Sequence, residues 1–158
     1  MRHPEAVATL LIVHHTPSPA LQALLEAVTD GARHDAIEGV EVRLRPALTC
    51  PETEVLAADG YVLGTPANLG YMSGALKHFF DRIYYPCLHA TRRRPYGVYV
   101  HGNNDTTGAL RSIERVVTGL QWREITRPVD SIGEPDRPQL DAAWELGATV
   151  AATLSERS

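Results

Sequence analysis

Three short polar segments contain the residues of this sequence that could bind a charged or planar ligand. They comprise residues 14–20 (HHTPSPA), 64–74 (GTPANLGYMSG) and 101–108 (HGNNDTTG). Each combines hydroxyl, amide or imidazole side chains with proline or glycine, which restrict or widen the choice of backbone conformation. Each also follows a short apolar run, so all three could lie where a buried strand ends.

The first segment joins an apolar run to the start of an amphipathic stretch. Unpaired backbone N–H groups and the helix dipole favour an anion at such a start. The dipole contributes only roughly 0.3–1 kcal/mol, so hydroxyls such as those of Thr16 and Ser18 must supply most of the affinity. The segment contains neither GxGxxG nor GxxxxGK[ST], which disfavours a dinucleotide fingerprint and an ordinary P-loop. An anion site and a plain helix start capped by Ser18 both fit these residues.

The second segment can fold closely around a flat ligand. Pro66 fixes one backbone angle, and Gly70 allows a conformation that other residues rarely adopt. Asn68 adds polar surface and Tyr71 adds aromatic surface. The alternative, an ordinary turn before a helix capped by Ser73, leaves this combination of residues unexplained.

The third segment offers two asparagines, an aspartate and two threonines beside a glycine. Gly102 permits close approach of the backbone to a ligand. Taken alone, the segment is better explained as a plain turn in which Asp105 or Thr107 caps the next helix. Its position after a buried strand favours a role in the same site as the other two segments.

Three histidines could bind a metal by residue type, but their expected geometry disfavours a metal site. His14, His15 and His101 stand near strand ends, and three imidazoles can bind zinc. Neighbouring residues of a strand point to opposite faces, so His14 and His15 are not expected to converge. We expect one of them at the ligand site and the other in packing, and His78 on a helix surface. No nucleophile or acid/base pair with a matching orienting group is evident, so hydrolytic chemistry is unsupported.

The bulk composition is that of a soluble globular protein. The chain has 158 residues, 44% of them hydrophobic and 22% charged, with a net charge of −4. A single domain over residues 1–158 is expected, and the charge argues against nucleic-acid binding. Cys50 and Cys87 form no CxxC pair, so free thiols in a reducing compartment are expected. No segment has the form of a signal peptide or a membrane span, so we expect a cytoplasmic protein.

Apolar runs alternate with amphipathic stretches along the whole chain. The runs predict strands at residues 7–13, 40–44, 60–64, 96–100 and 122–129, the second at an edge and the last broken by Pro128. The intervening helices are expected after Ser18 and up to Gly31, around 53–58, from Ser73 to Pro86, over 107–120 and over 139–155. This α/β alternation predicts a doubly wound parallel sheet, which binds ligands beyond the carboxyl ends of its strands.

At the second segment the sequence resembles a known group of proteins. The run from Gly64 to Arg82 reads G-T-P-x-x-x-G-x-M-S-G-x-L-K-x-F-x-D-R. It is similar to the second flavin loop and following helix of the flavodoxin-like NAD(P)H:quinone oxidoreductases and NADPH-dependent FMN reductases. The resemblance implies a flavodoxin-like three-layer α/β/α fold with a five-stranded parallel sheet in the order 2-1-3-4-5. It also implies FMN as cofactor and NADPH or NADH as reductant.

The same resemblance implies a set of cofactor-binding residues spread over the three segments. Pro19, Ala20 and Leu21 depart from the Gly-x-Thr or similar residues with which phosphate loops of the family usually end. The Asp81–Arg82 end of the helix is expected to be largely structural, and the two side chains could form an ion pair without a catalytic role. Arg92 to Arg94 are expected in a solvated turn, a site for an NADPH phosphate being less favoured. The expected cofactor-binding residues are His15, Thr16, Ser18, Ala20, Leu21, Pro66, Ala67, Asn68, Leu69, Gly70, Tyr71, Met72, His101, Gly102, Asn103, Asp105, Thr106 and Thr107.

These expectations leave three functions open. The first is an FMN-dependent oxidoreductase that takes electrons from NAD(P)H to a quinone or another small acceptor. The second is an electron carrier that docks on protein partners, and the third is a flavin-binding protein without turnover. A net charge of only −4 gives a weak steering field, and the third segment has no aromatic residue to cover the flavin, so the first is favoured. By resemblance, a homodimer or homotetramer is expected, with no nucleic-acid or membrane partner.

Overall fold

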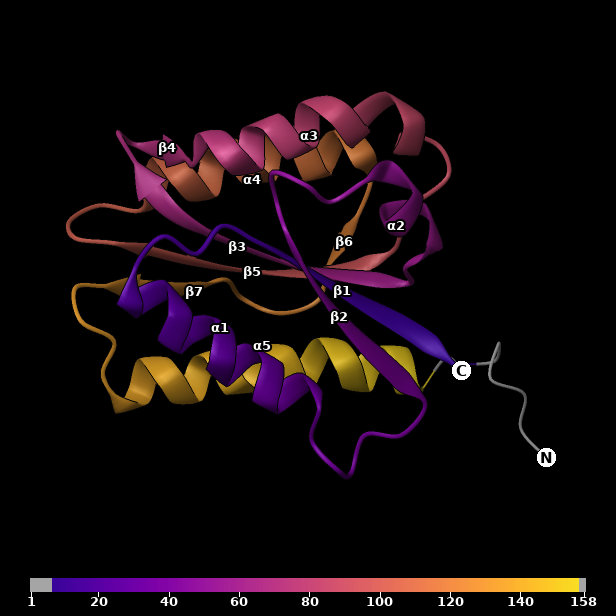
Figure 1. The fold of residues 1–158 in the computed structure, drawn as a ribbon, viewed down its shortest axis with the longest axis horizontal. Coiled ribbons are helices and arrows are strands. Elements are labelled where there is room, and N and C mark those ends of the chain that lie inside the picture. The colour runs from indigo at the N-terminus through magenta and orange to yellow at the C-terminus, as the bar shows by residue number, and fades with distance from the viewer. Residues whose placement is uncertain (1–6, 157–158) are drawn as a thin grey trace.

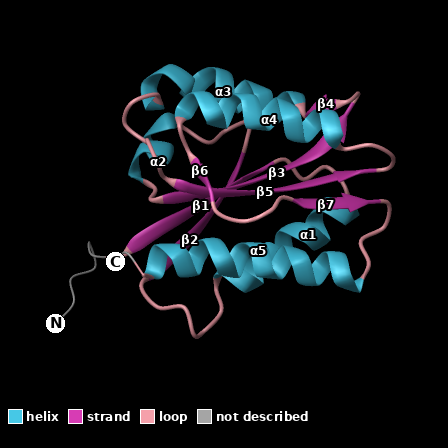
Figure 2. Cartoon of the chain, turned by 180° about the vertical axis from the view of Figure 1, so that it is seen from behind, coloured by secondary structure: helices cyan, strands magenta, loops and turns pink. Residues whose placement is uncertain are grey.

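A mostly parallel sheet between two layers of helices makes up the part of the chain that the computed structural model describes, residues 7–156. Figure 1 shows one layer above the sheet and one below it. The upper layer contains α2 (Glu52–Ala57), α3 (Gly74–Cys87) and α4 (Thr107–Leu120). The lower layer contains α1 (Pro19–Ala32) and α5 (Arg137–Ser155), and Figure 2 shows the same layers from behind.

The strand order is that of a flavodoxin-like sheet. The strands are β1 (Ala8–His14), β2 (Val40–Pro46), β3 (Gly60–Asn68), β5 (Pro95–Gly102), β6 (Arg123–Glu124) and β7 (Val129–Ile132). They run in the order β2-β1-β3-β5-β6, with β7 also paired to β5 and all of these pairs parallel. The two-residue β4 (Tyr71–Met72) pairs antiparallel with the end of β3. The predicted fold class and order are therefore confirmed, with β5 as the fourth strand of that order and β6 with β7 as the fifth.

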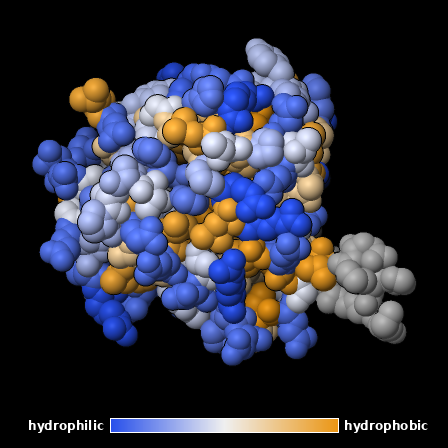
Figure 3. Space-filling model, viewed as in Figure 1, coloured by the Kyte–Doolittle hydropathy of each residue, from blue (hydrophilic) through white to orange (hydrophobic). Residues whose placement is uncertain are grey.

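Burial explains why the central strands are continuously apolar and β2 is not. Residues 10–13 of β1 are completely buried because helices cover both faces of the strand. In contrast, β2 pairs only with β1 and alternates apolar with charged residues, as predicted for an edge strand. Figure 3 shows apolar side chains among charged ones on the face where β2 lies.

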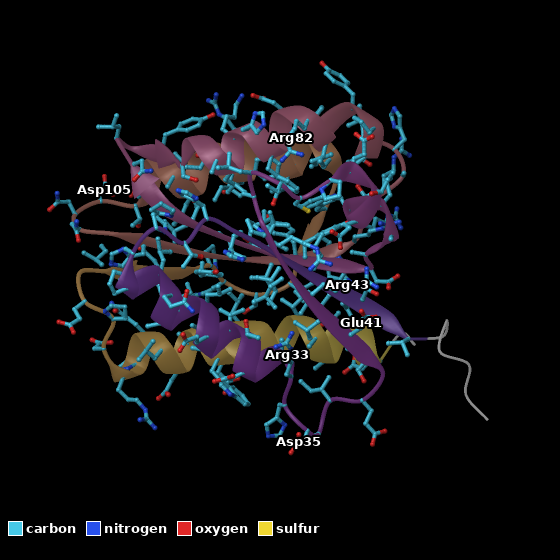
Figure 4. The ribbon with its side chains drawn as sticks, viewed as in Figure 1. Arg33, Asp35, Glu41, Arg43, Arg82 and Asp105 are labelled. Atoms are coloured by element: carbon cyan, nitrogen blue, oxygen red, sulfur yellow. The ribbon has the colours of Figure 1, made fainter. Side chains whose placement is uncertain are left out.

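Arginine side chains cover part of the open edge of β2. Arg33 donates to the Val42 carbonyl (3.1 Å) and Arg45 to the Leu44 carbonyl (2.8 Å). Arg43 pairs with Glu41 at 2.7 Å, and Figure 4 labels Arg33, Glu41 and Arg43 around the strand. Charged side chains on an edge strand disfavour pairing with another chain.

The fifth predicted strand, residues 122–129, is wrong in its extent. Only Arg123 and Glu124 of that range form β6, and the chain then leaves the sheet before it pairs with β5 again as β7. The break includes Pro128, which has no N–H for a ladder hydrogen bond. The strand therefore resumes at Val129 and ends at Ile132, so the sequence placed its carboxyl end three residues too early.

Several predicted element ends also shift. Gly31 does not end α1, which continues to Ala32, and Pro86 lies inside α3, which ends at Cys87. Strand β3 runs past Gly64 to Asn68, so Pro66, Ala67 and Asn68 belong to a strand rather than to a loop. Helix α5 begins at Arg137, two residues before the predicted start at Gln139, because Asp136 and Gln139 form a capping box.

Gly31 and Gly147 allow α1 and α5 to pack with their backbones in close contact. A Cβ on Gly31 would lie 1.9 Å from the Trp144 carbonyl oxygen, and one on Gly147 would lie 1.9 Å from that of Val28. The role of Gly31 is thus to let the helices approach, not to terminate one. No described helix is long and apolar enough to cross a membrane.

Replacing Gly147 tests this packing. We expect Gly147→Ala to lower the free energy of unfolding by about 1–3 kcal/mol, because the rigid Val28 backbone must move away from the new methyl group. The matched control is Gly119→Ala in α4, where the new methyl meets only the Tyr84 side chain and alanine improves helix propensity. Urea unfolding followed by circular dichroism measures both, and equal stability of the two variants would contradict the packing argument.

Candidate functional site

The carboxyl ends of β1, β3 and β5 meet at one edge of the sheet. The register pairs His14 with Gly64 and Pro66 with His101, which brings the three polar segments together. In Figure 1 these loops lie at the left end of the molecule, and the chain leaves the helices on the right to enter the strands. All three segments therefore lie at the edge of the sheet where the ligand site was predicted.

The first loop, between β1 and α1, is held by hydrogen bonds at both ends. The His15 N–H donates to the Gly64 carbonyl (3.0 Å), which continues the strand pairing by one residue. Ser18 is the N-cap of α1, and its Oγ accepts from the Leu21 N–H at 3.3 Å. Between them, His14 Nδ1 and Thr16 Oγ1 are 2.7 Å apart. Burial and the nearby His15 hold the pKa of His14 below its usual range.

The second loop is the tight hairpin between β3 and β4. Its two central residues, Leu69 (φ 50°) and Gly70 (φ 75°), both have left-handed backbones, as in a type I′ turn. The hairpin is anchored from two sides, because the Met72 N–H donates to Ser112 Oγ (3.1 Å) and the Ser73 N–H to Thr65 Oγ1 (3.0 Å). The predicted unusual conformation at Gly70 is confirmed.

The second and third loops are in close contact. A Cβ on Gly108, in the first turn of α4, would lie 1.9 Å from the Gly70 carbonyl oxygen. A Cβ on Gly102 would lie 3.1 Å from the Thr106 methyl and 3.3 Å from Ala67 Cβ. The position of the hairpin tip thus depends on the absence of a side chain at Gly108.

The third loop is fixed to the neighbouring β7 and α4. Thr106 is buried and donates its hydroxyl hydrogen bond to the carboxylate of Asp130. The Thr107 N–H donates to Asp105 Oδ1 (2.9 Å), and the hydroxyl and N–H of Thr107 lower the pKa of Asp105. The N-cap of α4 is Thr106, so neither predicted cap, Asp105 or Thr107, occupies that position. Asp105 accepts from the first N–H of the helix instead, and Figure 4 labels it at the loop end of the molecule.

A fourth loop, residues 133–136 between β7 and α5, was missed by the sequence analysis. It bonds back to β5, with His101 Nε2 at 2.7 Å from the Gly133 carbonyl and the Gly133 N–H at 2.8 Å from the Gly102 carbonyl. Together with α1 and β5 it borders an open pocket of about 320 Å³ lined by Pro19, Ala20, Ala23, His101, Asn103, Gly133, Glu134 and Pro135. The rule for carboxyl ends of strands would have pointed to it, had the end of the fifth strand been placed at Ile132.

The eighteen predicted site residues divide into two groups. Leu21, Met72 and Thr106 have their side chains in the protein interior, so only their backbone could face a ligand. Pro66 and Gly102 are also buried, as parts of β3 and β5. The others are at least partly exposed, namely His15, Thr16, Ser18, Ala20, Ala67, Asn68, Leu69, Gly70, Tyr71, His101, Asn103, Asp105 and Thr107.

A buried phenol lies beside Gly64 of β3 without a hydrogen-bond partner in the protein. Tyr99 is fully buried, and its hydroxyl oxygen would be 2.2 Å from a Cβ on Gly64, which pairs in register with His14. That oxygen is one of the few buried polar side-chain atoms of the described chain with no hydrogen bond. Burial raises the pKa of Tyr99, so the phenol is neutral.

Two arginines bond to backbone carbonyls that the sequence did not reveal as their partners. Arg82 does not pair with Asp81: Asp81 binds Lys77 at 2.6 Å, and Arg82 donates to the carbonyls of Cys50 (2.8 Å) and Ala47 (2.7 Å). The structural role expected for this helix end is thus confirmed through other partners, and Figure 4 labels Arg82 at α3.

The second arginine lies in the turn at residues 92–94, where Arg92 and Arg93 are exposed, as predicted. Arg94 departs from the prediction, because it is only partly exposed and donates to the carbonyls of Val55, Leu56 and Ala58 and to the Tyr61 hydroxyl. It joins α2 to β3.

The remaining histidines and cysteines have ordinary environments. His101 bonds to the Gly133 carbonyl and His14 to Thr16, and the described residues contain no group of three potential metal ligands. His78 is exposed on α3, as predicted. Cys50 and Cys87 are free and buried, and desolvation raises both thiol pKa values to about 11.

Comparison with known proteins identifies the family. The model of the NADPH-dependent FMN reductase family matches residues 44–133, which is more than half of the chain and includes the second and third loops. The chain therefore belongs to the NADPH-dependent FMN reductase family, a group of flavodoxin-like oxidoreductases. FMN and a reduced nicotinamide nucleotide are the cofactors that this membership indicates.

Individual relatives agree with this assignment. A flavodoxin from Aquifex aeolicus is 36% identical over 47% of this chain and 39% of its own length. An NAD(P)H dehydrogenase (quinone) from Acidithiobacillus ferrooxidans is 26% identical over 48% of this chain and 47% of its own length. The matched parts thus span less than half of either relative.

Solved structures show the same fold at low sequence identity. A WrbA-like flavodoxin from Agrobacterium tumefaciens superimposes with a TM-score of 0.78 at 18% identity, covering 96% of this chain and 99% of that one. An archaeal flavodoxin gives 0.78 at 14% identity, covering 92% and 98%.

The donor set at this edge of the sheet fits FMN. Hydroxyls and backbone N–H groups of the first loop suit an anion, while the hairpin and the third loop offer backbone and amide groups for a polar ring. The same region contains the unpartnered Tyr99 hydroxyl beside Gly64, and it leaves little room for a side chain at Gly102.

Ser112→Ala tests the anchoring of the hairpin. Without Ser112 Oγ, the buried Met72 N–H loses its acceptor, and we expect a loss of about 1–3 kcal/mol in unfolding free energy. Hydrogen exchange at the Met72 amide should accelerate. The control is Thr153→Ala in α5, which removes a hydroxyl bond to the Thr149 carbonyl and leaves no N–H unpaired. Unchanged exchange at Met72 in Ser112→Ala would refute the anchor.

Proposed function

We propose that this protein is an FMN-dependent oxidoreductase that takes electrons from NADPH or NADH and passes them to a quinone or another small acceptor. The observation that carries the proposal is the contact between the Gly70 carbonyl and Gly108, by which the hairpin of the family's flavin motif is held against the third loop. Family membership supports oxidoreductase chemistry and FMN. The route of the electrons is the part that we add.

Each loop has a distinct task in this proposal. The first loop binds the phosphate through Thr16, Ser18 and the backbone at Ala20, with His15 beside them and the Leu21 N–H held by Ser18. The hairpin from Pro66 to Met72 borders the ring, and His101, Gly102 and Asn103 with residues 105–107 border it from β5. When bound, FMN supplies the hydride and electron chemistry, and the protein holds it with one ring face accessible.

The exposed side chains of the hairpin favour a small apolar acceptor. Leu69 is fully exposed (106%) and Tyr71 is 43% exposed, so the rim of the proposed ring site is apolar and aromatic. A quinone can contact such a rim with its flat apolar ring. The weak net charge of −4 provides little steering toward a charged redox protein, which makes the carrier function the second candidate.

Two predictions on assembly and location accompany the proposal. A homodimer or homotetramer is expected by resemblance, and light scattering on the purified protein would establish it. We expect no nucleic-acid or membrane partner and a cytoplasmic location.

Flavin binding can be tested first and turnover second. FMN should be bound by the purified protein, as shown by flavin absorption or by quenching of FMN fluorescence on titration. The loaded protein should then oxidise NADPH or NADH when a benzoquinone is present. Absence of FMN binding would refute the proposal. Reduction only through a partner reductase would favour the carrier.

A matched pair of glycine variants tests the site itself. Gly108→Ala places a methyl against the Gly70 carbonyl, whereas Gly74→Ala, at the start of α3, meets nothing within 4 Å. We expect Gly108→Ala to weaken FMN binding about tenfold or more, because the hairpin tip must shift and a small misplacement costs binding energy of about 1.4 kcal/mol per factor of ten. Gly74→Ala should bind FMN like the parent protein. Equal affinity of the two variants would exclude the hairpin from the site.

A further inference from the structure

The first loop has few groups that can bind a phosphate. Pro17 and Pro19 have no N–H, and the N–H groups of His15 and Leu21 already donate to Gly64 and to Ser18. Within residues 14–21, the N–H groups left for a ligand are those of Thr16, Ser18 and Ala20. The first turn of α1 reads Pro-Ala-Leu and has no hydroxyl side chain. A phosphate must therefore rely on the hydroxyls that precede the helix.

The direction of one hydrogen bond decides whether the Thr16 hydroxyl can donate to a phosphate. Thr16 Oγ1 is 2.7 Å from His14 Nδ1, and the His14 ring can either donate or accept in this bond. If Nδ1 accepts, the Thr16 hydroxyl proton is used inside the protein. If Nδ1–H donates, the Thr16 proton is free to point to an anion, because a hydroxyl has one donor and two acceptor positions.

We propose that His14 is a positioning residue that donates from Nδ1 to Thr16 and so directs the Thr16 hydroxyl as a donor to the cofactor phosphate. In this chain the His14–Thr16 pair takes the place of hydroxyls absent from the first turn of α1. The inference rests on the proposed FMN site and deepens it.

The surroundings of His14 suit this task. As the last residue of β1, His14 pairs in register with both Pro46 and Gly64, which fixes its backbone on two sides. Leu10 and Ile12 of β1 lie in the core on the α1 side of the sheet, so strand alternation directs the His14 side chain to that side too. The Tyr99 phenol covers Gly64, the register partner of His14, on the same side. The lowered pKa of His14 keeps the imidazole neutral near pH 7, so the choice between tautomers rather than a charge sets the direction of the bond.

Phosphate-specific binding provides the test. We would measure the dissociation constants of FMN and of riboflavin, which lacks the phosphate, by flavin fluorescence quenching. Thr16→Val should weaken FMN binding about tenfold, the effect of a hydrogen bond to a charged group, and leave riboflavin binding unchanged. His14→Leu should weaken FMN binding by several-fold with the same selectivity. His14→Asn, whose amide can donate from nearly the position of Nδ1, should restore most of it.

The double variant and a spectroscopic measurement complete the design. His14→Leu combined with Thr16→Val should bind FMN no more weakly than Thr16→Val alone, because His14 acts only through Thr16. The control His78→Leu removes an exposed histidine of α3 and should change neither constant. Nitrogen-15 chemical shifts of His14 should show a protonated Nδ1 in the FMN complex.

Several results would overturn the inference. These are an unchanged ratio of FMN to riboflavin affinity in His14→Leu, additive losses in the double variant, or an unprotonated Nδ1 in the FMN complex. Equal losses for FMN and riboflavin would assign His14 a purely structural role. If the parent protein binds riboflavin and FMN equally well, the flavin site stands and the phosphate role of Thr16 falls. If it binds neither, the proposed function itself fails.

Discussion

Close approach of backbones at glycine positions sets the spacing on which the rest of this structure depends. Gly31 and Gly147 let α1 and α5 touch through their main chains, and Gly64 leaves room for the Tyr99 ring above β3. Gly108 lets the hairpin after β3 rest on the start of α4. A side chain at any of these positions would separate two elements. Since interiors are packed without room for an extra methyl group, the separation would be transmitted to the loops at the carboxyl edge.

The loops differ in how they use this frame. The hairpin and the third loop are fixed by hydrogen bonds to α4 and β7, through Ser112 and Asp130, so their shape exists before any ligand arrives. Preformed polar groups bind a ligand without the cost of ordering them. The first loop is restricted instead by two prolines, which narrow its conformations but also remove two donors. The two prolines thus make the first loop more rigid but leave it with fewer N–H donors. The His14–Thr16 pair lies in this donor-poor loop.

Much of this arrangement could be predicted from the sequence, for identifiable reasons. Continuous apolar runs marked the buried strands β1, β3 and β5, and the caps Ser18 and Ser73 marked two helix starts, because both signals are local. The fifth strand could not be delimited, since the return of the chain to β5 after Pro128 is a tertiary pairing. The fourth loop was missed as well, because it follows the end of that strand. Contacts between distant residues, such as Gly70 with Gly108 or Arg94 with α2, leave no local pattern. The carbonyl partners of Arg82 could not be predicted for the same reason.

The turn at the hairpin tip shows where local preference yields to another requirement. Both central residues have positive φ, a geometry for which asparagine followed by glycine is favoured. Leucine at the first of these positions costs roughly 1–2 kcal/mol in backbone energy and exposes its whole side chain to solvent. No contact of the Leu69 side chain within the described chain offsets either cost, since the tip is held by backbone pairing and by Ser112. In the proposed flavin site, an apolar side chain on the rim would gain contacts when a flat apolar ligand lies beside it. The proposed function thus gives a reason for the exposed Leu69 that the turn alone does not.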